Sequence, residues 1–123
     1  MEYLYLKWID YRTNKKYLIG ALCRDKVNKK YYFKMSKEHV EKALSENAIS
    51  KAMLPFYDLD QIYESNQIFS VFKIRLPKIE QYSEDELKEL LDSLDMNEYD
   101  EFEYLKKTKG ILMTDKFIVE EEK

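Results

Sequence analysis

Three short runs of alternating apolar and polar residues fill the N-terminal part of the chain and constrain the fold more than any other feature. In the first run, Leu4, Leu6 and Trp8 stand at every second position. This is the period of a β-strand with one buried face, so these side chains are predicted to point inward. Gly20 lies inside the second run and predicts a bulge or a close backbone approach. The runs and the polar loops between them cover residues 3–9, 10–15, 16–24, 25–29 and 30–35.

Serine residues mark the predicted starts of helices in the middle of the chain. Ser36 precedes a helix predicted at 37–46. Ser65 precedes a second helix predicted from Asn66 to about Arg75, which Pro77 closes. No element is predicted between these two helices, where a Leu-Pro pair favours extended backbone.

Two more helices and a closing strand are predicted in the C-terminal part. Ser83 and Glu86 have the spacing of a capping box. The amphipathic helix that follows has an apolar face made of Leu87, Leu90, Leu91 and Leu94. Asn97 is the predicted cap of the last helix, and Gly110 its left-handed end. The apolar stretches at 111–119 predict a strand pair or one bent strand.

These patterns predict an α+β fold. It has an N-terminal antiparallel three-stranded meander, central and C-terminal helices, and a closing C-terminal strand or strand pair. Although 37% of the residues are charged, 15% are aromatic, which favours a buried core over disorder. The predicted single domain, residues 1–123, divides into a β meander at 1–35, a mainly helical segment at 36–109, closing strands at 110–120 and an acidic tail at 121–123.

The scarcity of several residue types excludes whole classes of chemistry. One cysteine forms no internal disulfide, and one cysteine with one histidine builds no Cys/His zinc site. Two isolated glycines leave no phosphate-binding loop. No signal-peptide pattern is visible, and no apolar run approaches the roughly 18 residues that cross a bilayer. We therefore predict a cytoplasmic, non-enzymatic domain without cofactor, metal, membrane contact or small-molecule substrate.

Two single residues were weighed as chemical groups and interpreted as structural. Cys23 lies near the end of a predicted strand, where a free cysteine usually packs as a small apolar side chain. His39 lies one turn into a predicted helix, and no nucleophile pattern accompanies it. Both are predicted to be non-catalytic.

Tyrosines interleave with lysines in the predicted meander and form the first candidate binding surface. Such a surface suits a protein interface, because tyrosine offers a large contact area with little loss of rotamer entropy. Cations for phosphates and rings for bases also suit single-stranded nucleic acid, which is the alternative. The candidate residues are Tyr3, Tyr5, Tyr11, Lys15, Lys16, Tyr17, Tyr31 and Tyr32.

The net charge of −3 hides a polarity along the chain. Residues 1–51 carry twelve Lys/Arg and six Asp/Glu, whereas residues 52–123 carry nine and eighteen. The two halves therefore have net charges of +6 and −9 and can attract each other within one fold. A further hypothesis is a small inhibitor whose acidic half occupies a nucleic-acid groove of a partner protein. Its candidate residues are Asp92, Asp95, Glu98 and Glu101.

The order of these elements resembles the N-terminal subdomain of HipA-type serine/threonine kinase toxins. The resemblance includes the glycine-bearing second strand around Gly20, and the stretch Ile68–Pro77, which is similar to that subdomain's aromatic helix ending in Leu-Leu-Pro. Further matching segments are Phe33–Met35, Phe102–Leu105, Gly110 and the apolar tail at 111–120. Similar segments also occur ahead of HIRAN domains.

The resemblance implies a binding and regulatory role without catalysis. In that family the small subdomain is fused to the kinase or, in HipS-like proteins, is a separate chain that docks on the kinase as an antitoxin. The implied partner is a protein, either a kinase-type toxin or a nucleic-acid-processing complex. Lys73 and Arg75 depart from the family pattern, and no individual contact residue is carried over.

Overall fold

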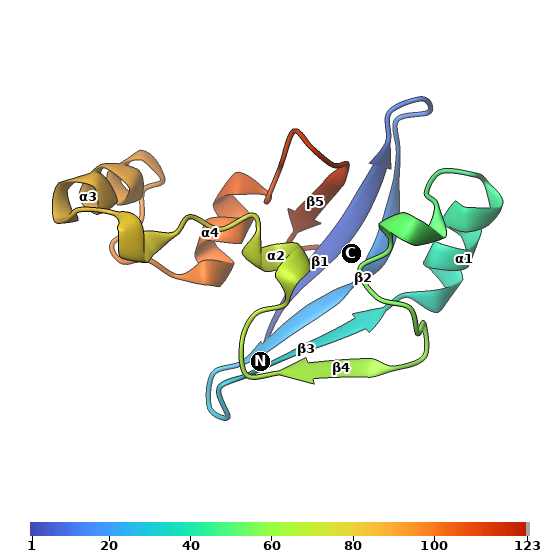
Figure 1. The fold of residues 1–123 in the computed structure, drawn as a ribbon, viewed down its shortest axis with the longest axis horizontal. Coiled ribbons are helices and arrows are strands. Elements are labelled where there is room, and N and C mark those ends of the chain that lie inside the picture. Colours follow the sequence, from blue (N-terminus) through green and yellow to red (C-terminus); the bar gives the residue numbers. More distant parts are fainter. Residues whose placement is uncertain (123) are drawn as a thin grey trace.

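Five strands among residues 1–122, which the computed structural model describes, pair in the order β4-β3-β2-β1-β5 (Figure 1). Every neighbouring pair is antiparallel, and the predicted α+β fold with its N-terminal meander is confirmed. The strands are β1 (Glu2–Asp10), β2 (Lys15–Asp25), β3 (Lys30–Met35), β4 (Ile62–Ser65) and β5 (Phe117–Glu120). The helices are α1 (Lys37–Ser45), α2 (Ser70–Lys73), α3 (Glu84–Ser93) and α4 (Glu101–Thr108), with 3-10 turns η1 (Lys51–Met53) and η2 (Ile79–Gln81).

One face of the sheet and three of the helices share an apolar core. Leu4 and Leu6 are fully buried and Trp8 is 4% exposed, so their predicted inward orientation is confirmed. The Trp8 indole donates a hydrogen bond of 2.8 Å to the Ala48 carbonyl, and its ring meets the edge of Phe117 at 4.9 Å. Helices α1, α2 and α4 contribute Val40, Ala43, Phe72, Phe102 and Leu105 to the same core.

Gly20 occupies the bulge that its place in the sequence predicts. The β1–β2 register shifts between Leu6 and Lys7, so Ile19 is the extra residue on β2. A Cβ built on Gly20 would lie 2.6 Å from the Lys34 carbonyl oxygen and 2.6 Å from Cζ of Phe33. The close approach of β3 to β2 therefore requires a residue without a side chain here.

The helix predicted over 66–75 with Ser65 as its cap is wrong. Ser65 is the last residue of β4, and its hydroxyl accepts a hydrogen bond from the Gln67 amide. Helix α2 covers only Ser70–Lys73 and begins after Phe69. Tertiary pairing overrides the local helix signal, because β4 satisfies backbone groups of β3 that would otherwise form a bare sheet edge.

Of the other predicted helix caps, one is confirmed and one is wrong. The Ser83–Glu86 capping box is confirmed. Ser36 precedes α1 but makes no capping hydrogen bond. Asn97 is not the cap of α4, because the Asp100 carboxylate accepts from the Glu103 amide instead.

The left-handed backbone after α4 begins at Lys109 (φ 59°) and continues at Gly110 (φ 58°). Of the two alternatives predicted at 111–119, a strand pair or one bent strand, the structure has a single strand, β5, which pairs with β1 at the edge of the sheet.

Two arginines join the later segments to this framework. Arg75 is 5% exposed and donates to the Gly110 carbonyl and, at 2.6 Å, to the Asp115 carboxylate. Arg24 on β2 pairs with the Asp100 carboxylate at 2.7 Å and lies 4.3 Å from the centre of the Phe102 ring. Arg24 therefore connects the N-terminus of α4 to the sheet.

We expect Gly20→Ala to lower the free energy of unfolding by about 1–3 kcal/mol, because the new methyl group would overlap the Lys34 carbonyl and the Phe33 ring. Urea unfolding followed by circular dichroism measures the effect. Val27→Ala is the control, since Val27 is 90% exposed and its change should stay within about 0.5 kcal/mol. Equal stability of the two variants would contradict the close approach.

Asp100→Asn should make the protein less sensitive to acid. Burial raises the pKa of Asp100, but hydrogen bonds from Arg24 and from the Glu103 amide outweigh it and bring the pKa below its usual range. The stability that this carboxylate contributes is therefore present above a pH of about 4 and is lost as the pH falls toward its folded-state pKa.

Asparagine can still cap α4, so the variant removes the charge and one acceptor for Arg24 while it keeps the cap. We expect it to be about 1–2 kcal/mol less stable at pH 7 and to lose less unfolding free energy between pH 6 and pH 3. Urea midpoints measured across this pH range test the expectation. Asp92→Asn, on the exposed side of α3, is the control. Parallel pH profiles for wild type and Asp100→Asn would contradict it.

Candidate protein-binding surface

The side chains that alternate away from the core form a second sheet face, which we call the open sheet face. They alternate along the strands with Leu4, Leu22 and Phe33, so they lie on the other face of the sheet. Within residues 1–122, every buried side chain of the α-helices belongs to the core, which lies on the side of the sheet away from this face. The open sheet face consists of Tyr3, Tyr5, Lys7, Ile9, Lys16, Leu18, Ala21, Cys23, Lys30, Tyr32, Lys34, Ile62, Glu64, Ile118 and Glu120.

Large apolar and aromatic side chains on this face keep contact with solvent. Tyr3 is 51% exposed and Ile62 is 64% exposed, and Tyr5 and Tyr32 are half-buried. Small side chains on β2 separate the larger ones, because Cys23 lies between Tyr3 and Tyr32 in the register. The result is a surface with rings on both sides of a strand that carries small residues.

Three of the four lysines of the open sheet face pair with carboxylates, whereas Lys34 donates to the Leu59 carbonyl. Lys7 and Lys16 both bind Glu120, with N–O distances of 2.9 and 3.0 Å, and Lys30 binds Glu64 at 2.9 Å. The hydrogen bond from Lys7 lowers the pKa of Glu120, and Lys16 adds to this against the opposing effect of burial. The positive charge of this face is therefore partly offset within the fold, because Glu64 and Glu120 stand against its four lysines.

The structure divides the predicted tyrosine and lysine candidates among different surroundings. Tyr3, Tyr5, Lys16 and Tyr32 share the open sheet face. Tyr11 is 61% exposed in the β1–β2 loop. Lys15 points to the other side of the sheet and lies 3.7 Å from Glu46. The strand alternation alone separates Lys15 from Lys16.

Tyr17 and Tyr31 lie on the core side of the sheet. Tyr17 is 7% exposed, and its hydroxyl donates to Glu46, which raises the pKa of Tyr17 to about 12. Tyr31 is half-buried; burial and the hydrogen bond that it donates to Glu101 raise its pKa to about 12. Both hydroxyls thus serve the fold.

The acidic candidates also separate. Asp92 and Glu98 are exposed, and Asp95 follows α3 with a φ of 55°. Glu101 instead accepts the hydroxyl of Tyr31 at 2.9 Å. Only the first three share one projecting segment.

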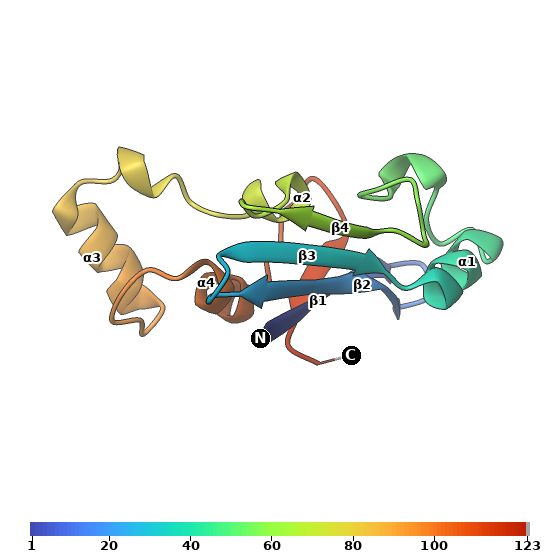
Figure 2. The same ribbon diagram turned by 90° about the horizontal axis from the view of Figure 1, so that it is seen from below.

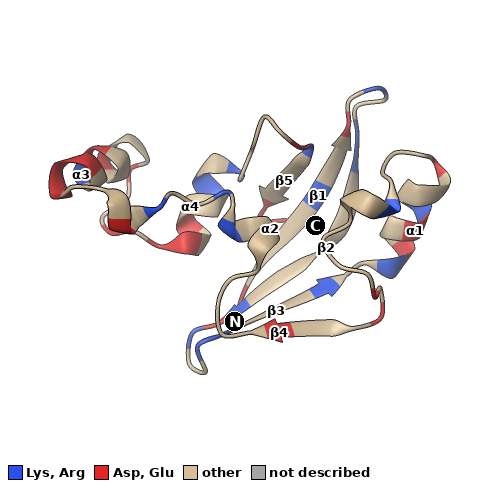
Figure 3. Ribbon diagram, viewed as in Figure 1, with Lys and Arg blue, Asp and Glu red and all other residues tan. Residues whose placement is uncertain are grey.

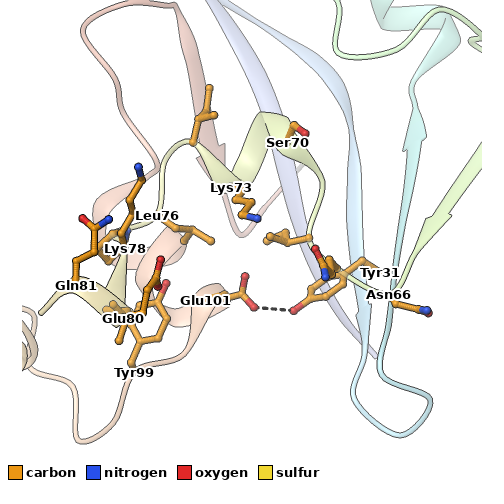
Figure 4. A pocket seen from close by; sticks show the side chains of 15 residues that line it. Tyr31, Asn66, Ser70, Lys73, Leu76, Lys78, Glu80, Gln81, Tyr99 and Glu101 are labelled. Atoms are coloured by element: carbon orange, nitrogen blue, oxygen red, sulfur yellow. Dashed lines mark hydrogen bonds between the residues drawn. The ribbon is translucent and has the colours of Figure 1, made fainter.

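A cleft of about 780 Å³ separates α2 and η2 from the start of α4 (Figure 4). The Tyr31–Glu101 hydrogen bond crosses it, and Lys73 and Lys78 extend from its α2 side. Burial raises the pKa of Tyr99, which lines the opposite wall. Among residues 1–122, every buried polar side-chain atom has a hydrogen-bond partner, so the cleft offers a ligand no unpaired buried group.

Cys23 is buried in the sheet, whereas His39 is exposed on α1. Cys23 is 7% exposed, and its Sγ lies 3.4 Å from Sδ of Met1. His39 is exposed, with Nδ1 2.6 Å from the Ser36 hydroxyl. Within residues 1–122, no three His, Cys, Asp or Glu side chains are grouped to hold a metal ion. The helices described here are all too short or too polar to cross a membrane.

Two parts of these surfaces escaped sequence reasoning. Ile62 joins the open sheet face through β4, whose four residues are too short for a periodic signal. The cleft depends on segments distant in sequence, such as Tyr31 and Tyr99, that carry no common motif. No protein-family model, curated protein or solved structure matches the chain.

We expect Glu120→Gln to lower the free energy of unfolding by about 1–2 kcal/mol, because it leaves Lys7 without its carboxylate. The Lys7 side chain is only 13% exposed, so water replaces that partner poorly. Urea unfolding measures the change, and Glu121→Gln is the matched control at an exposed position. A loss no larger than that of the control would contradict the buried ion pair.

Proposed function

We propose that this chain is a non-catalytic binding and regulatory module that docks on a protein partner through the open sheet face. The observation that carries the proposal is the exposed, tyrosine-rich side of the sheet, where Tyr3, Tyr32 and Ile62 stand outside the core. Interface cores are enriched in aromatic residues, and the open sheet face presents three tyrosines.

The ion pairing of the face favours a protein partner over nucleic acid. A strand-binding surface needs cations that are free to meet phosphates. Lys7, Lys16 and Lys30 already contact Glu120 or Glu64, so a phosphate chain would have to compete with these carboxylates for them. Tyrosines flanked by internal ion pairs bury well against another protein, because few charges lose their partners on binding.

The resemblance to the HipA N-terminal subdomain suggests the class of partner, a HipA-type kinase toxin that the chain would control as an antitoxin. The segments that carry the resemblance have structural roles here. Gly20 allows β3 to approach β2, and Phe72 is fully buried. The resemblance therefore supports the proposed class of partner, whereas the proposed docking surface is inferred from the exposed tyrosines.

The proposal is tested with the double variant Tyr3→Ser/Tyr32→Ser. We expect wild type to bind the HipA-type kinase encoded nearest to it and to reduce kinase autophosphorylation. The double variant should bind at least about tenfold more weakly, because buried tyrosines are frequent hot spots. Calorimetry and the phosphorylation assay provide the two readouts.

Tyr57→Ser is the matched control, since Tyr57 is fully exposed and lies outside the open sheet face. No complex with wild type would rule out the kinase as partner. Equal affinity of wild type and the double variant would move the docking surface elsewhere. A shift of labelled single-stranded DNA at low salt that disappears with added salt would favour the nucleic-acid alternative.

A further inference from the structure

Helix α3 has an apolar face that takes no part in the core. Leu87, Leu90, Leu91 and Leu94 form this face, which we call the α3 leucine face; all four are half-buried. They belong neither to the core nor to the partly buried side chains packed against it. Figures 1 and 2 both show α3 at one end of the molecule, apart from the strands and opposite α1.

The ends of α3 explain how it forms without this packing. Its N-terminus has the Ser83–Glu86 capping box and three acidic residues in the first turn, which suit the helix dipole. Its last turn has no basic residue, and Asp92 and Asp95 stand at the negative end. This placement works against the helix, so the fold gains nothing from these two charges.

Most acidic residues around α3 also lack an ion-pair partner. Residues 79–103 carry eleven Asp/Glu and a single Lys, and the ribbon in Figure 3 is red over much of α3 and at the start of α4. The exceptions at its C-terminal end are Asp100, Glu101 and Glu103, which contact Arg24, Tyr31 and Lys106. The other eight acids of this segment have no ion pair to any of residues 1–122: Glu80, Glu84, Asp85, Glu86, Glu89, Asp92, Asp95 and Glu98.

We infer that the α3 leucine face docks a cationic amphipathic helix of a partner protein. The leucines would contact the apolar side of that helix, and the surrounding carboxylates would pair with Lys or Arg on its flanks. Charge complementarity selects this occupant, because nucleic acids, anionic membranes and the same arm of a second copy all carry the wrong sign. The inference concerns a different surface from the open sheet face and does not rest on it.

A designed peptide of about 18 residues, with leucines at helical spacing and lysines on both flanks, is the probe. We expect it to bind the full-length protein in fluorescence anisotropy, with an affinity that falls as salt is added. A peptide with glutamates in place of the lysines should not bind. A scrambled peptide with the same composition should bind much more weakly, because it lacks the apolar stripe.

Two variants separate the contributions of charge and leucine. Asp92→Asn/Asp95→Asn/Glu98→Gln should weaken binding about tenfold, as the loss of three exposed ion pairs implies. Its control, Glu41→Gln/Glu121→Gln/Glu122→Gln, removes three exposed acids elsewhere and should bind within about twofold of wild type. Leu87→Ser/Leu91→Ser should abolish binding. Leu87→Met/Leu91→Met should retain it, because methionine is also apolar and favours a helix.

Tyr3→Ser/Tyr32→Ser should leave peptide binding unchanged, so the two proposed surfaces succeed or fail separately. Equal binding of the scrambled peptide, or an unchanged affinity of the Asp92, Asp95 and Glu98 variant, would overturn the inference. Concentration-dependent dimerisation in sedimentation that disappears in Leu87→Ser/Leu91→Ser would replace the partner helix with a second copy of this chain.

Discussion

The ring of Phe33 lies over Gly20, and the rest of the core depends on this contact. Because Gly20 has no Cβ, the ring can enter the centre of the core, where Phe56, Phe69 and Phe72 lie 5.4, 6.4 and 5.7 Å from it. These three rings come from a segment with little regular structure of its own. Aromatic packing onto Phe33 therefore holds that segment, and with it the pairing of β4 to β3.

The polarity of charge along the chain serves two purposes. Part of it is internal, because acids of the second half, such as Asp100 and Glu120, pair with Arg24, Lys7 and Lys16 of the first half. The acids around α3 are not used in this way. A single exposed charge has little effect on stability. In a run of like charges the side chains repel one another, and the binding of a partner of opposite charge relieves this repulsion.

The two proposed surfaces differ in the physics of recognition. The open sheet face is rigid, since β1, β2 and β3 hold Tyr3, Tyr5 and Tyr32 by backbone pairing, and two glutamates already offset part of the charge of its lysines. Burial of ring area would dominate there, with weak dependence on salt. The α3 leucine face is rimmed by free carboxylates and would attract partners over a longer range at low salt. A module with both could combine fast capture with a specific final contact.

The alternation of Leu4, Leu6 and Trp8 determined by itself the first strand and its inward face, because the apolar set of a period of two lies on one side of the sheet. The capping box at Ser83 was equally local and was predicted correctly. The sequence also supplied Tyr3, Tyr5 and Tyr32 as site candidates, but only the register of paired strands divided them from Tyr17 and Tyr31. Tertiary structure alone turned residues 62–65 into a strand and left α3 outside the core. Both outcomes depend on contacts between distant segments, whose free energy exceeds the local preferences that a sequence displays.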